Sequence, residues 1–311
     1  MNAPLPHGGA EDVDLTTQMP TSEDVRSIGE IIRDTRALSA EQVAQILKYQ
    51  RDYDTKFGEA AIALGYATSE DVLRALAQQF NYAYGNAEQQ RASPELVVLN
   101  QPFGQQAESF RAIRAQIMMR THPDARGHTV KRALAVVSPN TGDGKTYFCA
   151  NLSISLAQLG GRTLVVDADL RGARLHQVFD VDARSGLSTL LAGRRGSNVI
   201  KPVKSVPNLF VMPVGPTPPN PLELVQGPAF GLLLQELLTR FDHVVVDTPA
   251  AQYGADCAVV AGRCGAALIV ARKDATKVDD LQSFAQTLAA ANAKLAGVVM
   301  NEFSPARPRQ D

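Results

Sequence analysis

The sequence has no tryptophan, few aromatic residues and only three cysteines. Cys149, Cys257 and Cys264 lie in apolar surroundings without paired spacing, which favours buried thiols over a disulfide or a metal site. There is also no signal peptide and no apolar run of 18 residues or more. We therefore expect a cytoplasmic protein without a membrane span of its own.

An excess of charge of either sign is missing as well, because Lys and Arg total 31 against 32 Asp and Glu. This balance argues against nucleic acid or an anionic membrane as a main partner, and we expect no nucleic-acid partner. The 311 residues are 45% hydrophobic, which is enough for one α/β domain of about 180 residues and a smaller second domain.

An internal repeat occupies the first part of the chain. Segments that begin at Ile28 and Phe57 share identical residues at an offset of 29, since 57 − 28 = 29. Each copy predicts a helical hairpin, and two such short copies must pack on each other to bury their apolar faces. Each copy also holds a capping box: Ser39 with Gln42, and Thr68 with Asp71.

This repeat resembles the amino-terminal modules of type II secretion and pilus ATPases, whose relatives include domains that bind cyclic di-GMP. In those binders an arginine precedes the Leu-Gly of each copy, whereas here Ser27 and Lys56 stand there, and Ile28 and Phe57 replace the leucine. A docking role and a cyclic di-GMP site both remain open, and these departures favour docking.

A helix is predicted from Gln105, in the segment QQAESFRAIRAQIMMR. Glu108, Arg111 and Arg114 follow at three-residue spacing and therefore share one face, beside an apolar stripe. By spacing alone, a solvated helix with an internal Glu108–Arg111 pair is favoured over a subunit contact. The apolar stripe consists of Phe110, Ile113 and Ile117.

The stretch from Ala133 to Arg171 carries the strongest chemical signal. An apolar strand, Ala133–Val137, enters a loop with two glycines followed by Lys145 and Thr146, and an apolar helix leaves it. Glycines let backbone N–H groups approach a phosphate, and the start of the helix adds its positive dipole end. Lysine would reach the β- and γ-phosphates and the threonine hydroxyl would bind Mg²⁺. Pro139 replaces the usual first glycine of this motif.

Acidic residues end two of the predicted strands. LVVDADLR ends in Asp167 and Asp169, which strand alternation would place on the same side. HVVVDTPA presents Asp247 in the same way. Carboxylates at the carboxyl ends of parallel strands are suited to Mg²⁺ or to accepting a proton beside a phosphate.

Strands and helices alternate through the rest of the chain, which predicts an α/β P-loop NTPase fold with a doubly wound parallel sheet and a small helical N-terminal domain. We expect five regions, namely a disordered tail (1–22), the helical repeat domain (23–86), a linker (87–104), the P-loop domain (105–303) and a C-terminal tail (304–311).

Five motifs in this order resemble the bacterial tyrosine kinases, in particular the EpsG-type chain-length-determinant kinases. They are the Glu-x-x-Arg-x-x-Arg helix from Glu108, the SPNTGDGKT loop, LVVDADLR, the proline-rich GPTPPNPLEL turn and VVVDTPA. The resemblance implies an ATP- and Mg²⁺-dependent kinase that regulates exopolysaccharide export with a Wzz-like membrane chain-length-determinant protein. It also implies a location at the inner membrane through that partner, and a homo-oligomeric ring.

The resemblance assigns roles to individual residues. Lys145 would bind phosphates, Asp167 would accept the tyrosine proton, and Asn301 would contact adenine. Metal ligands would be Thr146, Asp169 and Asp247, with catalysis resting on Lys145 and the three acids. The remaining nucleotide contacts would be Thr141, Gly142, Asp143, Gly144, Thr146 and Tyr147. Glu108, Arg111 and Arg114 would contact the neighbouring subunit of the ring.

The chain departs from the family at its end, where NEFSPARPRQD contains no tyrosine and all seven tyrosines lie at or before Tyr253. The phosphate acceptor therefore stays open, with Tyr253 as the nearest internal candidate. Two alternatives are a MinD/ParA-like ATPase switch and a nucleotide-binding adaptor with little catalysis. Asn140 stands where the switch proteins carry a signature lysine, and the complete set of acids argues against the adaptor.

Overall fold

The computed structural model describes residues 26–80, 93–121, 131–194 and 198–302. The chain forms two compact units, residues 1–81 and 82–311, and we treat each by itself. The expected tails at 1–22 and 304–311 lie outside the described residues. Within the described ranges no helix is both long enough and apolar enough to cross a bilayer.

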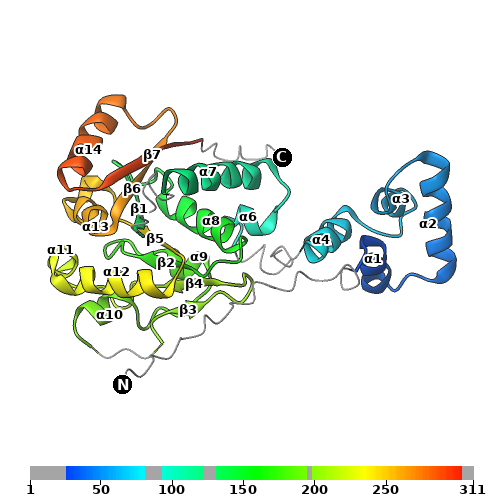
Figure 1. The fold of residues 1–311 in the computed structure, drawn as a ribbon, viewed down its shortest axis with the longest axis horizontal. Helices are drawn as coiled ribbons and strands as arrows, with labels where there is room; N and C mark the ends of the chain where they lie inside the picture. The colour runs from blue at the N-terminus through cyan, green and yellow to red at the C-terminus, as the bar shows by residue number, and fades with distance from the viewer. Residues whose placement is uncertain (1–25, 81–92, 122–130, 195–197, 303–311) are drawn as a thin grey trace, which may run out of the picture. The chain divides into compact units, whose positions relative to one another are not determined.

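The first unit is the helical repeat (Figure 1). Its helices are α1 (Ile28–Arg36), α2 (Ala40–Tyr53), α3 (Phe57–Ala63) and α4 (Ser69–Gln79). Both predicted capping boxes are formed, and Ser27 with Glu30 makes a third that the sequence analysis missed. Buried side chains of the hairpins share one small core, which includes Ile31, Ile32, Ile46 and Ala60. The packing of the two hairpins on each other is confirmed.

The second unit is built on a seven-stranded sheet with the order β3-β4-β2-β5-β1-β6-β7. The strands are β1 (Ala133–Val137), β2 (Thr163–Asp167), β3 (Lys201–Pro202), β4 (Leu209–Met212), β5 (His243–Asp247), β6 (Gly265–Arg272) and β7 (Lys294–Asn301). All neighbouring pairs are parallel except β3 and β4. The predicted doubly wound parallel sheet is confirmed, with a short antiparallel edge that the sequence did not indicate.

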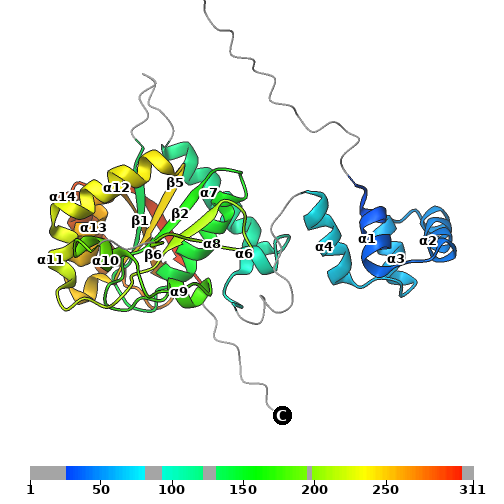
Figure 2. The same cartoon turned by 90° about the horizontal axis from the view of Figure 1, so that it is seen from below.

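Helices cover both faces of this sheet (Figure 1). Successive side chains of a strand point to opposite faces, and here both sets are apolar and must be buried. Leu134 and Val136 join the core beneath α6 (Val97–Asn100), α7 (Gln105–Thr121), α8 (Lys145–Ala157) and α9 (Leu175–Val178). Ala135 and Val137 join the core on the opposite face. Figure 2 shows the two helical layers from below.

The second layer contains the remaining helices of the unit. They are α10 (Leu187–Leu191), α11 (Pro221–Gln226), α12 (Pro228–Arg240), the 3₁₀ turn η1 (Ala251–Tyr253), α13 (Asp256–Cys264) and α14 (Val278–Ala290). Pro221 occupies the first turn of α11, as the proline-rich motif predicts, because proline lacks only an N–H that has no partner there. The three cysteines are buried free thiols, which confirms the prediction from their spacing.

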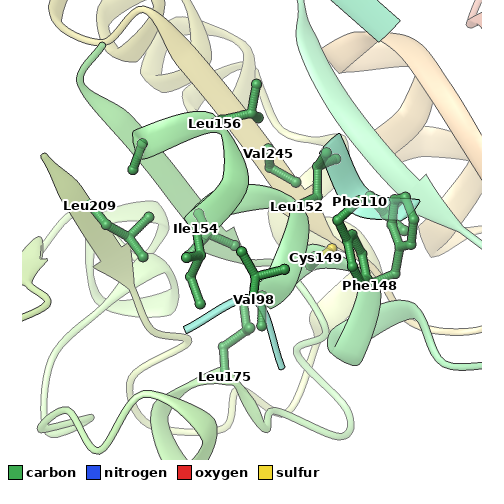
Figure 3. Close-up of a cluster of buried hydrophobic side chains, with 14 of the residues drawn as sticks. Val98, Phe110, Phe148, Cys149, Leu152, Ile154, Leu156, Leu175, Leu209 and Val245 are labelled. Carbon is green, nitrogen blue, oxygen red and sulfur yellow. The ribbon is translucent and has the colours of Figure 1, made fainter. Parts of the chain in front are cut away.

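The expected linker at 87–104 needs correction where it is described. Leu96, Val98 and Leu99 are fully buried, and α6 packs against α8 within the core of the second unit. Figure 3 shows Val98 among side chains of α8. A run of four residues is too short for its periodicity to reveal a helix, so the sequence suggested a loop. The P-loop unit therefore begins before residue 105.

Candidate active site

Three strand ends come together at one edge of the sheet. Since β5 lies between β1 and β2, the loop that follows β1 is next to Asp247 at the end of β5 and Asp167 at the end of β2. The two aspartates occupy paired positions in the parallel ladder, and Ala168 N–H donates to the carbonyl of Asp247 at 2.9 Å. The predicted loop and two of the predicted acids therefore lie side by side.

The loop from Pro139 to Gly144 depends on glycine at two positions. Gly142 has φ +83° and Gly144 has φ +100°, a region that other residues rarely adopt. A Cβ atom on Gly144 would also lie 2.2 Å from Nδ2 of Asn301. Gly144 is the N-cap of α8, so the N–H groups of the first turn of α8 have no partner within the helix.

Hydrogen bonds hold this loop on two sides. Thr141 N–H donates to Oε1 of Gln252 at 3.2 Å, and Nε2 of Gln252 donates to the Thr141 hydroxyl at 3.0 Å. On the other side, Nδ2 of Asn301 donates to the carbonyl of Asp143 at 2.9 Å. The buried Asp143 carboxylate accepts from Asn140 N–H at 3.0 Å and from the Thr276 hydroxyl at 3.1 Å. The loop is thus fixed to the segments after β5 and β6 and to the end of β7.

Lys145 begins α8 and is 7% exposed. Its Nζ donates to the hydroxyl of Ser138 at 2.9 Å. A buried ammonium group needs hydrogen-bond acceptors, and a hydroxyl satisfies only one of its three donors. The other two N–H donors of the Lys145 ammonium group are suited to an anionic ligand bound at the loop.

Thr146 and Asp247 form the next contact. The Thr146 hydroxyl donates to Oδ2 of Asp247 at 2.6 Å, and the Sγ of Cys149 lies 3.6 Å from Oδ1. Burial raises the pKa of Asp247 to about 6, although the Thr146 hydrogen bond and Lys145 oppose the rise. Burial likewise raises the pKa of the Cys149 thiol, so Cys149 stays protonated.

Asp167 is fully buried and held by backbone N–H groups. Its Oδ2 accepts from Arg174 and Leu175, each at 3.1 Å, and its Oδ1 accepts from Asp169 N–H at 3.2 Å. Burial, and then the nearby negative charge of Asp247, raise the pKa of Asp167 well above its ordinary value. A carboxylate with a raised pKa is a stronger base.

Asp169 lies differently from the prediction. Strand β2 ends at Asp167, so the strand alternation that we used does not reach residue 169. Instead its Oδ1 accepts from Arg171 N–H at 3.2 Å and Gly172 N–H at 2.8 Å in the turn that follows. The side chain is half-buried. Asp169 is close to Asp167 in the chain, but a turn rather than a strand positions it.

The residue types at the carboxyl ends of these strands fit a nucleoside triphosphate that is bound to Mg²⁺. No cluster of three or more His, Cys, Asp or Glu side chains among the described residues could hold a metal ion by itself. Mg²⁺ does not require one, because it commonly uses one or two carboxylates together with water and the phosphates of its substrate. The Thr146 hydroxyl and Asp247 supply oxygen ligands of that kind beside the loop.

Other predicted site residues are further from this centre. The Tyr147 ring packs beside Phe110 of α7, with centroids 6.0 Å apart, at the margin of the core on that face of the sheet. Arg111 donates to Glu108 at 2.7 Å and to the carbonyl of Pro102, and Arg114 donates to the carbonyl of Ser155. Both arginines therefore bind their own chain. The predicted apolar stripe is confirmed: Phe110 and Ile117 are buried, and Ile113 packs against the same core.

Sequence reasoning missed the residues that hold the loop in place. Gln252 and Thr276 are brought to the loop from separate segments and lie in no recognisable local pattern, whereas Ser138 is the first residue of the SPNTGDGKT loop and its contact with Lys145 was not predicted. Asn151 was also missed, although its place on the buried face of α8 is a signal, since a fully buried amide needs partners.

Comparisons with known proteins agree with this geometry. A family model, ParA, described as NUBPL iron-transfer P-loop NTPase, matches residues 129–308. CapB of Staphylococcus aureus, named as a tyrosine-protein kinase, is 32% identical over 209 residues, which cover 67% of this chain and 89% of CapB. This chain belongs to the bacterial tyrosine kinases, within the ParA-type P-loop NTPases.

Two further members of this tyrosine-kinase family show how far the similarity extends. The kinase domain of the Escherichia coli tyrosine kinase ETK is 29% identical with a TM-score of 0.62, covering 70% of this chain and 84% of that domain. EpsB of Ralstonia solanacearum, also named as a tyrosine-protein kinase, is 34% identical over 198 residues, which cover 64% of this chain but only 26% of EpsB. The family model lies within the second unit, so the helical repeat is outside it.

Proposed function

We propose that this tyrosine-kinase family member transfers the γ-phosphate of ATP to tyrosine, with Mg²⁺, and so regulates exopolysaccharide biosynthesis and export. The convergence of Lys145, Thr146, Asp247 and Asp167 on one glycine loop carries the proposal. The similarity to relatives that are named as tyrosine-protein kinases supports it.

Each residue of the proposed site has a distinct task in this scheme. Lys145 and the N–H groups of the first turn of α8 hold the phosphates, and by the family resemblance Asn301 would contact the base. Mg²⁺, when bound, neutralises charge on the transferred phosphoryl group. Thr146 and Asp247 would hold the metal, with Asp169 near it.

Asp167 accepts the proton of the tyrosine hydroxyl. Burial and the neighbouring negative charge raise the pKa of Asp167, which makes it a stronger base. Aligning this hydroxyl with the phosphate provides a large part of the rate enhancement.

Mapping of phosphorylated residues by mass spectrometry after incubation of the full chain with ATP and Mg²⁺ tests this function. We expect phosphotyrosine in the wild type and none in Lys145→Met, while Lys204→Met, at an exposed lysine, behaves as wild type. A second incubation includes a Glu–Tyr copolymer as an external acceptor. If ADP forms but no phosphotyrosine appears in either incubation, the result supports the ATPase switch instead. Undiminished phosphorylation in Lys145→Met would refute the site assignment.

The proposed ring rests on the family resemblance of the Glu108 helix. Arg111 is held by Glu108 and Pro102, so a neighbouring subunit would meet an already ordered guanidinium group. Arg111→Ala and Arg114→Ala should each lower the oligomer mass measured by light scattering, whereas Arg240→Ala on the exposed side of α12 should not. If the oligomer mass is unchanged in both variants, the role of this helix is purely structural.

The helical repeat is proposed to dock a membrane chain-length-determinant partner, which would place the kinase at the inner membrane. Ser27 and Lys56, the residues that replace the arginines of cyclic di-GMP binders, lie at the N-caps of α1 and α3. Calorimetric titration of the full chain with cyclic di-GMP separates the two roles. If the repeat serves only in docking, the titration should give no heat of binding. A saturable heat signal would show that the protein binds cyclic di-GMP.

A further inference from the structure

A buried segment connects the helix that carries Lys145 and Thr146 to the helix that holds Asp167. We name this segment, residues 93–100, the strap. It runs across the face of the second unit that contains α8 and α9, and its Leu96, Val98 and Leu99 side chains are at most 3% exposed. In Figure 3, Val98 and Leu175 lie beside the Ile154 side chain of α8.

One buried amide fastens the strap to α8. Oδ1 of Asn151 accepts from Val98 N–H at 3.0 Å, and its Nδ2 donates to the carbonyl of Glu95 at 2.8 Å. The same Nδ2 donates to the carbonyl of Tyr147, one turn earlier in α8, at 2.9 Å. Asn151 is 0% exposed, and both polar atoms of its side chain are used. The strap is therefore fixed to the helix that begins with Lys145.

Two other contacts fasten the strap to α9. The Ser93 hydroxyl, itself buried, donates to the carbonyl of Val178 at 2.6 Å. The Glu95 carboxylate pairs with the Arg174 guanidinium group. These contacts hold both ends of α9, whose first residues direct the N–H groups of Arg174 and Leu175 to Oδ2 of Asp167.

We infer that Ser93 and Glu95 are positioning residues for phosphoryl transfer, which they serve by fixing α9 and hence the orientation of the Asp167 carboxylate. The strap sets the place of Asp167 relative to the phosphate-binding start of α8, because it is bonded to both helices. This inference rests on the proposed function, in which Asp167 receives the tyrosine proton. Neither residue touches the nucleotide loop in the described contacts.

Kinetics of the full chain, with labelled ATP and a Glu–Tyr copolymer as acceptor, test the inference. Removal of the Ser93 hydroxyl in Ser93→Ala should lower kcat at least about tenfold, because a small displacement of a catalytic group is costly. The KM for ATP and the affinity for MgADP should stay within about twofold of wild type, since the loop and Lys145 are untouched. Ser93→Thr, which keeps the hydroxyl, should recover most of kcat.

Matched controls and a second variant exclude a general loss of structure. Glu95→Gln should reproduce the fall in kcat in weaker form, because Glu95 and Arg174 are partly exposed. Ser283→Ala and Glu236→Gln, at exposed positions of α14 and α12, should leave kcat unchanged. Retained binding of MgADP shows that each variant is folded around the loop.

The residual activity of Asp167→Asn makes the test specific. If Ser93 acts through Asp167, adding Ser93→Ala to Asp167→Asn should change the remaining rate by less than about twofold, because the two effects are then not additive. The same tenfold loss in both backgrounds, or a raised KM for ATP with kcat unchanged, would overturn the inference. Full phosphoryl transfer by Asp167→Asn alone would refute the proposed base with the strap intact, so the two failures are distinguishable.

Discussion

The hydroxyl of Thr146 donates a 2.6 Å hydrogen bond to the carboxylate of Asp247, which is 1% exposed. This contact joins the start of α8 to the end of β5. Thr146 lies in the first turn of α8 and Asp247 is the last residue of β5, and they meet because β1 and β5 are neighbours in the sheet.

Replacing Thr146 by valine removes this donor while keeping a similar shape. We expect the unfolding free energy to fall by about 1–3 kcal/mol, because a buried carboxylate loses a hydrogen bond. The turnover number should fall on the order of a hundredfold, since the hydroxyl proposed to hold Mg²⁺ beside the transferred phosphate is lost. Thr146→Ser retains the hydroxyl and should stay close to wild type in both urea unfolding and kinetics. Equal losses in the two variants would show that the methyl group, not the hydroxyl, matters.

The raised pKa of Asp247 predicts that acid stabilises the ligand-free protein at this residue. A carboxyl whose pKa rises on folding, here from 3.8 to about 6, stabilises the fold fully below pH 3.8. That contribution is lost as the pH rises through about 6, and it amounts to a free energy on the order of 1–3 kcal/mol.

Asp247→Asn should therefore raise the melting temperature of the ligand-free chain at pH 8, and have little effect near pH 4. It should also abolish the stabilisation that MgADP is expected to give the wild type, because the proposed metal ligand is missing. Scanning calorimetry at both pH values, with and without MgADP, measures these effects. An asparagine variant that is less stable at pH 8 than the wild type would contradict this account of the buried acid.

The two glycines of the loop should respond differently to alanine. In Gly142→Ala the added Cβ atom has no neighbour within 4 Å, so only the positive φ opposes the change. We expect it to lower the folding stability by about 1–2 kcal/mol. Gly144→Ala adds a collision at 2.2 Å with the Asn301 amide and should weaken nucleotide binding much more strongly. Binding of a fluorescent ADP analogue gives both affinities. Asn301→Ala should partly restore Gly144→Ala, and a lack of any restoration would mean that backbone strain alone is responsible.

Equivalent glycines of the helical repeat offer an internal comparison. A Cβ atom on Gly58 would lie 2.7 Å from Cγ1 of Val72, so Gly58→Ala should cost about 1–3 kcal/mol through overpacking. A Cβ atom on Gly29 would meet Phe57 at 3.6 Å, an ordinary contact, so Gly29→Ala should be neutral or stabilise by about 0.5 kcal/mol. Thermal unfolding of both variants measures which of them is less stable. Adding Val72→Ala to Gly58→Ala should restore part of the lost stability, because the colliding side chain is then removed. The reverse order would refute the close packing of α3 and α4.

The main elements of the fold were predictable because their signals are local. Glycine spacing identifies the loop before Lys145, and β-branched strands that end in acids identify the sheet edge at Asp167 and Asp247. The capping boxes at Ser39 and Thr68 were equally visible, since each involves residues three apart.

The remaining features depend on contacts between distant segments. Asp169 lies in a turn because β2 ends two residues earlier, and nothing in LVVDADLR marks that end. The strap was interpreted as linker because α6 is only four residues long, and its burial depends on Asn151, more than fifty positions later. Gln252 and Thr276 reach the loop only through the order of the strands.

The hydrogen bonds that fix the nucleotide loop have a thermodynamic consequence. Gln252 on one side and Asn301 and Thr276 on the other fix the loop before any ligand arrives. A preorganised loop loses little conformational entropy when it binds, so little of the binding free energy is spent on ordering the chain. The proposed nucleotide should therefore bind with little entropic cost from the loop, and its attraction to Lys145, which is 7% exposed, should be only weakly screened by added salt.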